Sequence, residues 1–342
     1  MATEREIIID ETSEEIIVND SEKTKKGILP VSKANHMAQT YLSYIYDGDD
    51  EDSRIELYSL MEDFFAQEQQ SGNADDFHNF AVELARKDEY LLACQVLECG
   101  LVLFPKSVDL LSDYLQYGVN CNKIEECKKA HKTLMKIPHR RWSWRGFAFV
   151  VDYLQFLIER SDSEKELEAR EKEILTIVEE FRRYFPYSEE SYRTEADVYK
   201  ALNMHDEELE TLQSALENVR VAPKCALRCA DVLFERGLYE EASQAIERGI
   251  KDATQTQSSV NEGYIYYLSA LCKIAIAQKA GLSMNEDEVN GIYSDFNIAL
   301  GKFRSSRSSY SDVIKTKTNT IVNKTGVDVD PKFDLLCECL VG

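Results

Sequence analysis

Apolar residues recur at helical spacing through most of the chain, and the helices that they predict come in pairs. From residue 74 onward, the pairs begin near residues 74, 108, 141, 189 and 223. Three of the four intervals between these starts are 33 or 34 residues, and the third pair is longer than the others by about 14 residues. Chance would not keep such a period, so the pattern indicates a repeated helix–turn–helix unit.

Two of these units share a skeleton of small and large apolar residues. In the pair that begins near residue 223, the skeleton is Ala226, Cys229, Ala230, Leu233, Gly237, Tyr239, Ala242, Ile246 and Gly249. In the pair that begins near residue 74, it is Phe77, Phe80, Ala81, Leu84, Tyr90, Ala93, Leu97, Gly100 and Pro105. Small residues stand where two helices must approach closely, and large apolar residues fill the space between them. A unit of this kind cannot bury its apolar face alone, so it stacks on its neighbours.

The skeleton resembles the tetratricopeptide repeat (TPR), a helix–turn–helix unit, over roughly residues 74–256. The resemblance implies an all-α fold, a right-handed α-solenoid of TPR-like helix hairpins with degenerate capping helices. The expected parts are an acidic mobile N-terminal segment (1–31), a degenerate capping helix pair (32–73), a TPR array of about five units with the third extended (74–256), a C-terminal helix pair (257–305) and a polar tail with a short terminal helix (306–342). Two β-branched runs in the first segment, Ile7–Ile9 and Ile16–Val18, could add a strand to another element.

In the TPR family, the first helix of each repeat lines a concave groove. Carried onto this chain, the resemblance implies partner-binding side chains at Trp142, Arg145, Phe149, Tyr153, His78, Arg86, Arg193, Lys200, Lys224 and Phe234. The third repeat then presents three aromatic rings and an arginine, a combination that concentrates binding energy at interfaces. The alternative is that the longer third pair shifts its helices and buries these rings.

The net charge of −22 argues against general binding to nucleic acid or to an anionic membrane, and favours a basic partner. The chain has no apolar run of 18 residues and no basic segment followed by an apolar core at its start. We therefore expect no transmembrane helix, no secretory signal and a cytoplasmic location. The nine cysteines are expected to act as small buried residues in a reducing compartment.

One stretch departs from this acidic balance. Residues 128–145 contain seven Lys or Arg residues, no acid, and both tryptophans of the protein. Guanidinium groups and indoles suit an anionic small molecule or stacking on nucleic acid, which gives an alternative function as a sensor. The stretch could also bind a protein, or be a solvated helix that pairs with acidic neighbours.

No motif for catalysis is present: HExxH, GxSxG, Walker and GxGxxG patterns are all absent. Cys127 and His131 stand four residues apart on a predicted helix, but packing explains Cys127 better than nucleophilic chemistry. The sequence predicts no catalytic residue, no metal site and no cofactor. The favoured function is a protein–protein interaction scaffold or adaptor that binds a peptide segment or partner subunit in a concave groove, either alone or as a subunit of a larger complex. We do not expect an enzyme.

Overall fold

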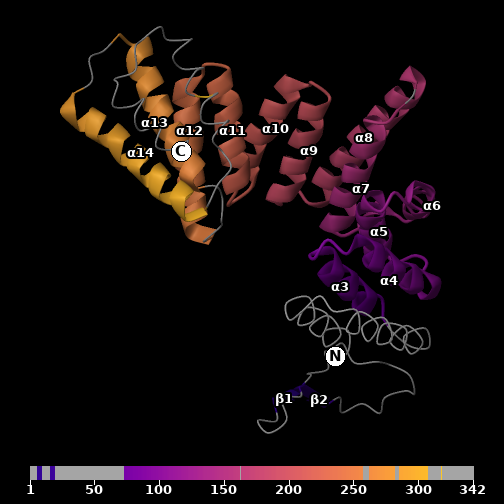
Figure 1. The fold of residues 1–342 in the computed structure, drawn as a ribbon. Coiled ribbons are helices and arrows are strands. Elements are labelled where there is room, and N and C mark those ends of the chain that lie inside the picture. Colours follow the sequence, from indigo (N-terminus) through magenta and orange to yellow (C-terminus); the bar gives the residue numbers. More distant parts are fainter. Residues whose placement is uncertain are drawn as a thin grey trace. The chain divides into compact units, whose positions relative to one another are not determined.

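The computed structural model describes residues 6–9, 16–19, 73–161, 163–256, 262–281, 285–306 and 317. The chain divides into two compact units, Met1–Glu180 and Phe181–Gly342. The expected capping pair at 32–73 lies outside the described residues except for Asn73, and most of the tail at 306–342 also lies outside them. From residue 73 onward, the described residues are almost entirely helices and the short turns that join them (Figure 1).

The two β-branched runs near the N-terminus pair with each other. Strands β1 (Glu6–Ile9) and β2 (Ile16–Asn19) are antiparallel, with Ile7 opposite Val18 and Ile8 opposite Ile17. β-branched side chains favour the extended backbone, so these runs are the natural place for strands.

The first unit is a stack of helix pairs. Its helices are α3 (Ala74–Ala85), α4 (Tyr90–Leu103), α5 (Val108–Asn120), α6 (Ile124–Leu134), α7 (Trp144–Ile158) and most of α8 (Glu164–Tyr184), with a short 3₁₀ helix η1 (His139–Arg141) before α7. Helix α3 packs on α4, and α5 packs on α6, as the antiparallel members of a hairpin. The first helices also contact one another, α3 with α5 and α5 with α7. We call the surface formed by α3, α5 and α7 the first-helix face.

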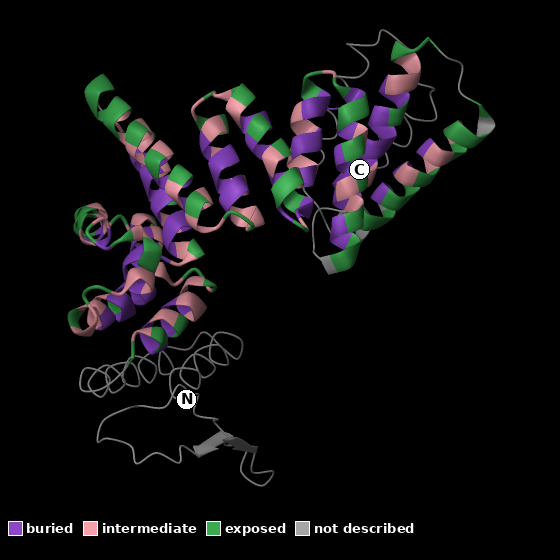
Figure 2. Ribbon diagram, turned by 180° about the vertical axis from the view of Figure 1, so that it is seen from behind, coloured by how far each residue is buried: buried purple, intermediate pink, exposed green. Residues whose placement is uncertain are grey.

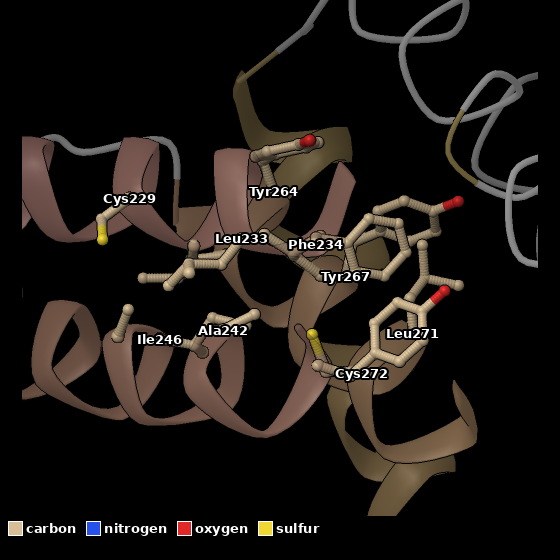
Figure 3. Close-up of a cluster of buried hydrophobic side chains, with 14 of the residues drawn as sticks. Cys229, Leu233, Phe234, Ala242, Ile246, Tyr264, Tyr267, Leu271 and Cys272 are labelled. Carbon is tan, nitrogen blue, oxygen red and sulfur yellow. The ribbon is translucent and has the colours of Figure 1, made fainter. Parts of the chain in front are cut away.

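The second unit repeats this arrangement. Its helices are α9 (Glu189–Ala201), α10 (His205–Asn218), α11 (Pro223–Glu235), α12 (Tyr239–Thr256), α13 (Glu262–Lys279) and α14 (Glu286–Ser306). Each packs on the next, and buried positions lie on the helix sides that meet (Figure 2). Phe234, Tyr264 and Tyr267 lie in the apolar core that α11, α12 and α13 share (Figure 3). Within each unit, the helix hairpins stack on one another in sequence order, which is the architecture of an all-α solenoid.

In four of the hairpins, the turn between the two helices contains a residue in the left-handed backbone conformation. The residues Asp88, Asn122, Asn203 and Gly237 have φ values of 62°, 59°, 59° and 76°. Each stands fourteen residues after the first residue of its hairpin: after Ala74, Val108, Glu189 and Pro223. Glycine, asparagine and aspartate are the residues that tolerate this left-handed conformation. In these four hairpins the turn residue therefore ends the first helix at the same distance from its start, so the second helices also begin at equivalent positions.

Close approach of the helices explains the small residues of the skeleton. A Cβ atom on Gly100 would lie 2.8 Å from Cγ of Phe77 and 3.0 Å from Cδ1 of Leu110. A Cβ atom on Gly249 would lie 2.8 Å from Cδ1 of Ile265. A Cβ atom at residue 100 would require the Phe77 ring to move, and one at residue 249 would require the end of the Ile265 side chain to turn aside.

The third hairpin begins three residues later than the sequence spacing predicts. Residues 139–141 form η1, and α7 starts at Trp144 rather than near residue 141. Ser143 fixes this start, because its Oγ accepts a hydrogen bond from the Gly146 amide at 3.2 Å and donates one to Asp109 at 2.7 Å. The extra length of the hairpin lies in α8, which has 21 residues.

Among the described helices, none combines the length and the apolar character needed to cross a bilayer.

Candidate partner-binding site

Two of the predicted groove residues meet at one buried carboxylate, and a third lies beside one of them. Nδ1 of His78 on α3 lies 2.5 Å from Oδ2 of Asp113 on α5, and Nη2 of Arg145 on α7 lies 3.5 Å from Oδ1 of the same group. The guanidinium carbon of Arg145 stands 5.2 Å from the centre of the Phe149 ring. We call His78, Asp113, Arg145 and Phe149 the Asp113 cluster. It spans the first-helix face, since α3, α5 and α7 each supply a member.

Burial controls the electrostatics of this cluster. The side chain of Asp113 is 1% exposed, whereas those of His78 and Arg145 are 19% and 27% exposed. Burial raises the pKa of Asp113, and the hydrogen bond and charge of His78 oppose that rise. The hydrogen bond to Asp113 raises the pKa of His78, and burial opposes it. A buried carboxylate is costly unless it is paired, and the contacts with His78 and Arg145 supply that pairing for Asp113.

The raised pKa of His78 predicts a pH dependence of stability. A group whose pKa is higher in the folded state stabilises the fold below its unfolded pKa, and the gain is lost as the pH rises through its folded pKa. We expect His78→Gln to lower the free energy of unfolding more at pH 5.5 than at pH 8.5, as measured by urea unfolding. In an Asp113→Asn background, His78→Gln should lower the free energy of unfolding by the same small amount at both pH values. If His78→Gln in the otherwise unchanged protein costs the same at both pH values, the ion pair between His78 and Asp113 is contradicted.

Comparison with known proteins addresses the fold. No family model and no curated protein matches the sequence. The C-terminal part of a TPR repeat-containing protein from Cytophaga hutchinsonii superimposes with a TM-score of 0.50 at 9% identity, over 77% of this chain and 92% of that one. A tetratricopeptide repeat protein from Parabacteroides merdae gives a TM-score of 0.46 at 14% identity, over 85% of this chain and 99% of that one. This chain has the TPR fold.

The TPR register explains why two predicted groove residues are buried instead. Trp142 is 4% exposed; its indole N–H donates to the carbonyl of Ile137 at 3.1 Å, and its ring lies 5.0 Å from that of Phe147. Tyr153 is 1% exposed and its ring lies 5.4 Å from that of His131. The expectation that these two rings line the groove is therefore wrong. It counted positions from residue 141, whereas the first TPR helix of this hairpin begins at residue 144.

Phe234 requires the same correction. Its ring is fully buried in the core of the second unit and lies 5.4 Å from that of Tyr239 (Figure 3). It packs there with residues of α12 and α13 in one apolar core.

Four other predicted residues are divided between the two units, Arg86 in the first and Arg193, Lys200 and Lys224 in the second. Arg86, in the first unit, is exposed and pairs with Glu83. In the second unit, Lys200 and Lys224 are exposed, and Arg193 is half-buried and pairs with Glu190.

The basic stretch at 128–145 is divided among α6, η1 and α7. Acidic side chains already meet part of it, since Lys128 lies 2.8 Å from Glu125 and His139 lies 3.5 Å from Glu180. Of its two indoles, only that of Trp144 is exposed. The stretch thus lacks the pair of stacking rings on which a nucleic-acid site was predicted.

Cys127 and His131 are both held neutral. Burial raises the pKa of the Cys127 thiol to about 12 and lowers the pKa of His131 to about 4. A thiol and an imidazole with these values do not exchange a proton near pH 7, so the pair packs rather than reacts. The Cys127 Sγ would lie 2.5 Å from a Cβ on Gly118, which shows how tightly it fits.

Sequence reasoning missed Asp113, the residue on which the cluster depends. The available signal was an acid at helical spacing with the apolar Leu110 and Tyr117, inside the buried stripe of α5. An acid in such a stripe is buried only when it is paired.

Proposed function

We propose that this protein is an interaction scaffold and that the first-helix face of its first unit binds a peptide segment of a partner protein through the Asp113 cluster. One observation supports this most strongly: three successive first helices converge on a buried carboxylate that positions Arg145 at the surface. A fold does not specify a function, so the proposal depends on this cluster rather than on the TPR fold.

Arg145 is held ready for a ligand. Asp113 accepts one N–H group at 3.5 Å, Tyr117 is a second hydrogen-bond partner, and the Phe149 ring lies beside the guanidinium. A guanidinium has five N–H donors, so these contacts leave capacity for a carboxylate or a backbone carbonyl of a bound segment. Because its side chain is already ordered, Arg145 loses little conformational entropy on binding.

Phe149 supplies the apolar part of the contact. It is half-buried and stands one turn along α7 from Arg145. Arginine and aromatic side chains surrounded by packed neighbours are the usual centres of binding energy, where truncation costs roughly 2 kcal/mol or more. The chemistry fits an extended segment that carries a carboxylate next to an apolar side chain.

The test is an affinity pull-down from the native host with tagged protein. We expect Arg145→Glu combined with Phe149→Ala to lose a partner that the wild type retains. The matched control is Lys128→Glu combined with Trp144→Ala, which makes the same change of charge and removes one exposed ring from the basic stretch instead. The control should retain the partner.

Two outcomes would contradict the proposal. Retention of the partner by the Arg145→Glu, Phe149→Ala variant would remove the Asp113 cluster from the interface. Loss of the partner by the control alone would move the function to the basic stretch at 128–145. Melting curves of both variants separate a loss of binding from a loss of folding.

A further inference from the structure

A single lysine from near the C-terminus is buried against α11 in the second unit. The side chain of Lys317 is only 7% exposed. Its Nζ lies 2.6 Å from Oε1 of Glu235 and 3.3 Å from Oδ1 of Asp231. The same ammonium group stands 5.6 Å from the centre of the Phe234 ring. Lysine is almost never buried unless it is paired in this way.

The residues that surround the ammonium group of Lys317 are held in place by other contacts. Asp231 and Glu235 stand one turn apart on α11, with Phe234 fixed in the core beside them. The hydroxyl of Tyr264, on α13, donates to Oδ1 of Asp231 at 2.5 Å. We call Asp231, Phe234, Glu235 and Tyr264 the acidic notch. The notch therefore has an oriented carboxylate, a second carboxylate and an aromatic ring.

This combination fits an ammonium group. Carboxylates make charge-assisted hydrogen bonds to lysine, and an aromatic ring within about 6 Å adds a cation–π attraction. Burial raises the pKa of Asp231, and the charge of Lys317 opposes that rise, so the carboxylate is stabilised by a cation in the notch. A protein with a net charge of −22 also draws basic polypeptides toward its surface.

We propose that the acidic notch is a binding site for a lysine side chain of a basic partner polypeptide, and that Lys317 occupies it in the free protein. The site lies in the second unit and does not depend on the Asp113 cluster of the first. Lys317 belongs to the same chain as the notch and therefore competes at a high effective concentration, on the order of millimolar, so partner binding is weakened while Lys317 occupies the notch.

The test uses the full chain and a fluorescent synthetic peptide with the sequence of residues 311–323, which includes the position of Lys317. Binding is measured by fluorescence anisotropy to the wild type and to two variants, Lys317→Ala and Lys317→Gln. The glutamine variant retains most of the side-chain stem and guards against a folding defect. We expect both variants to bind the peptide about tenfold more tightly than the wild type does, because the internal competitor is gone.

Two matched controls examine the chemistry. A peptide of the same sequence with Lys317→Ala should lose most of its binding. Glu235→Gln in the Lys317→Gln chain should weaken binding about tenfold, through loss of one charge-assisted bond. Glu235 is 65% exposed, so this change should not affect folding.

Equal binding to the wild type and to both Lys317 variants would overturn the proposal, as would binding that does not respond to Glu235→Gln. Arg145→Glu with Phe149→Ala should leave the peptide affinity unchanged. The experiment can therefore contradict the proposal for the acidic notch without contradicting the proposal for the Asp113 cluster, and the reverse.

Discussion

Phe77→Ala is expected to lower the free energy of unfolding of the first unit by about 3–5 kcal/mol, the usual cost of deleting a fully buried phenylalanine. Phe77 is 0% exposed and fills the space beside Gly100, between α3 and α4. Gly100→Ala should destabilise by about 1–3 kcal/mol for the opposite reason, since the added methyl group meets Phe77 at 2.8 Å.

The two changes should not be additive. In the double variant the methyl group on residue 100 enters space that the phenylalanine ring has left, so the combined loss should fall short of the sum by about 1 kcal/mol or more. Urea unfolding followed by circular dichroism measures all three variants. Gly301→Ala, at a helical glycine whose added Cβ meets no atom of the described residues within 4 Å, is the control and should stabilise slightly. Additive losses would show that Gly100 is not placed by contact with Phe77.

Arg228→Met is expected to have the largest effect in the second unit. Arg228, on α11, lies 2.9 Å from Glu208 on α10 and also pairs with Asp197 on α9, so it links three helices. The side chain of Glu208 is 4% exposed, and burial raises its pKa. Without the arginine, the described partners of this carboxylate are His205, at 3.7 Å, and the charge of Lys200. Breaking a buried pair in this way typically costs about 3–5 kcal/mol.

Two measurements test the cause of that loss. A carboxylate whose folded pKa is raised favours the fold at low pH and disfavours it as the pH rises through that pKa. The penalty of Arg228→Met should therefore shrink between pH 7 and pH 5. Adding Glu208→Leu should restore much of the stability at pH 7, because an apolar pair can replace a buried ion pair. A penalty that does not change with pH and persists in the double variant would mean that Arg228 acts by packing alone.

The fold could be predicted because its determinants are local. The left-handed turns at Asn122, Asn203 and Gly237, and the glycines that allow close helix contact, are visible as residue types at fixed spacing. Helix starts such as Ala74 and Pro223 follow from the same period. Each unit contacts its neighbours in one manner, so a repeated pattern leads to a repeated structure.

The third hairpin could not be placed this way because its spacing is irregular. The hydrogen bond from Ser143 to Asp109 sets the start of α7, and this contact joins two hairpins 34 residues apart in sequence. A shift of three residues turns a helix by most of a turn. It moved Trp142 and Tyr153 from the predicted groove into the core.

The two candidate sites depend on pairs that sequence spacing does not show. Asp113 meets His78 across 35 residues, and Lys317 meets Glu235 across 82. Arg145 and Phe149 were predicted from the count that began at residue 141, whereas the carboxylate that contacts Arg145 was not predicted. The partners of buried charges have to be observed in the structure, because many acids and bases in an acidic chain of 342 residues could pair.

Photo-crosslinking shows whether the Asp113 cluster touches a partner protein. A benzophenone amino acid replaces Phe149 in one protein and the exposed Trp144, on another side of α7, in a second. We predict that position 149 crosslinks a partner polypeptide in host extract, that position 144 does not, and that Arg145→Glu abolishes the crosslink. A crosslink from position 144 with none from position 149 would contradict the account.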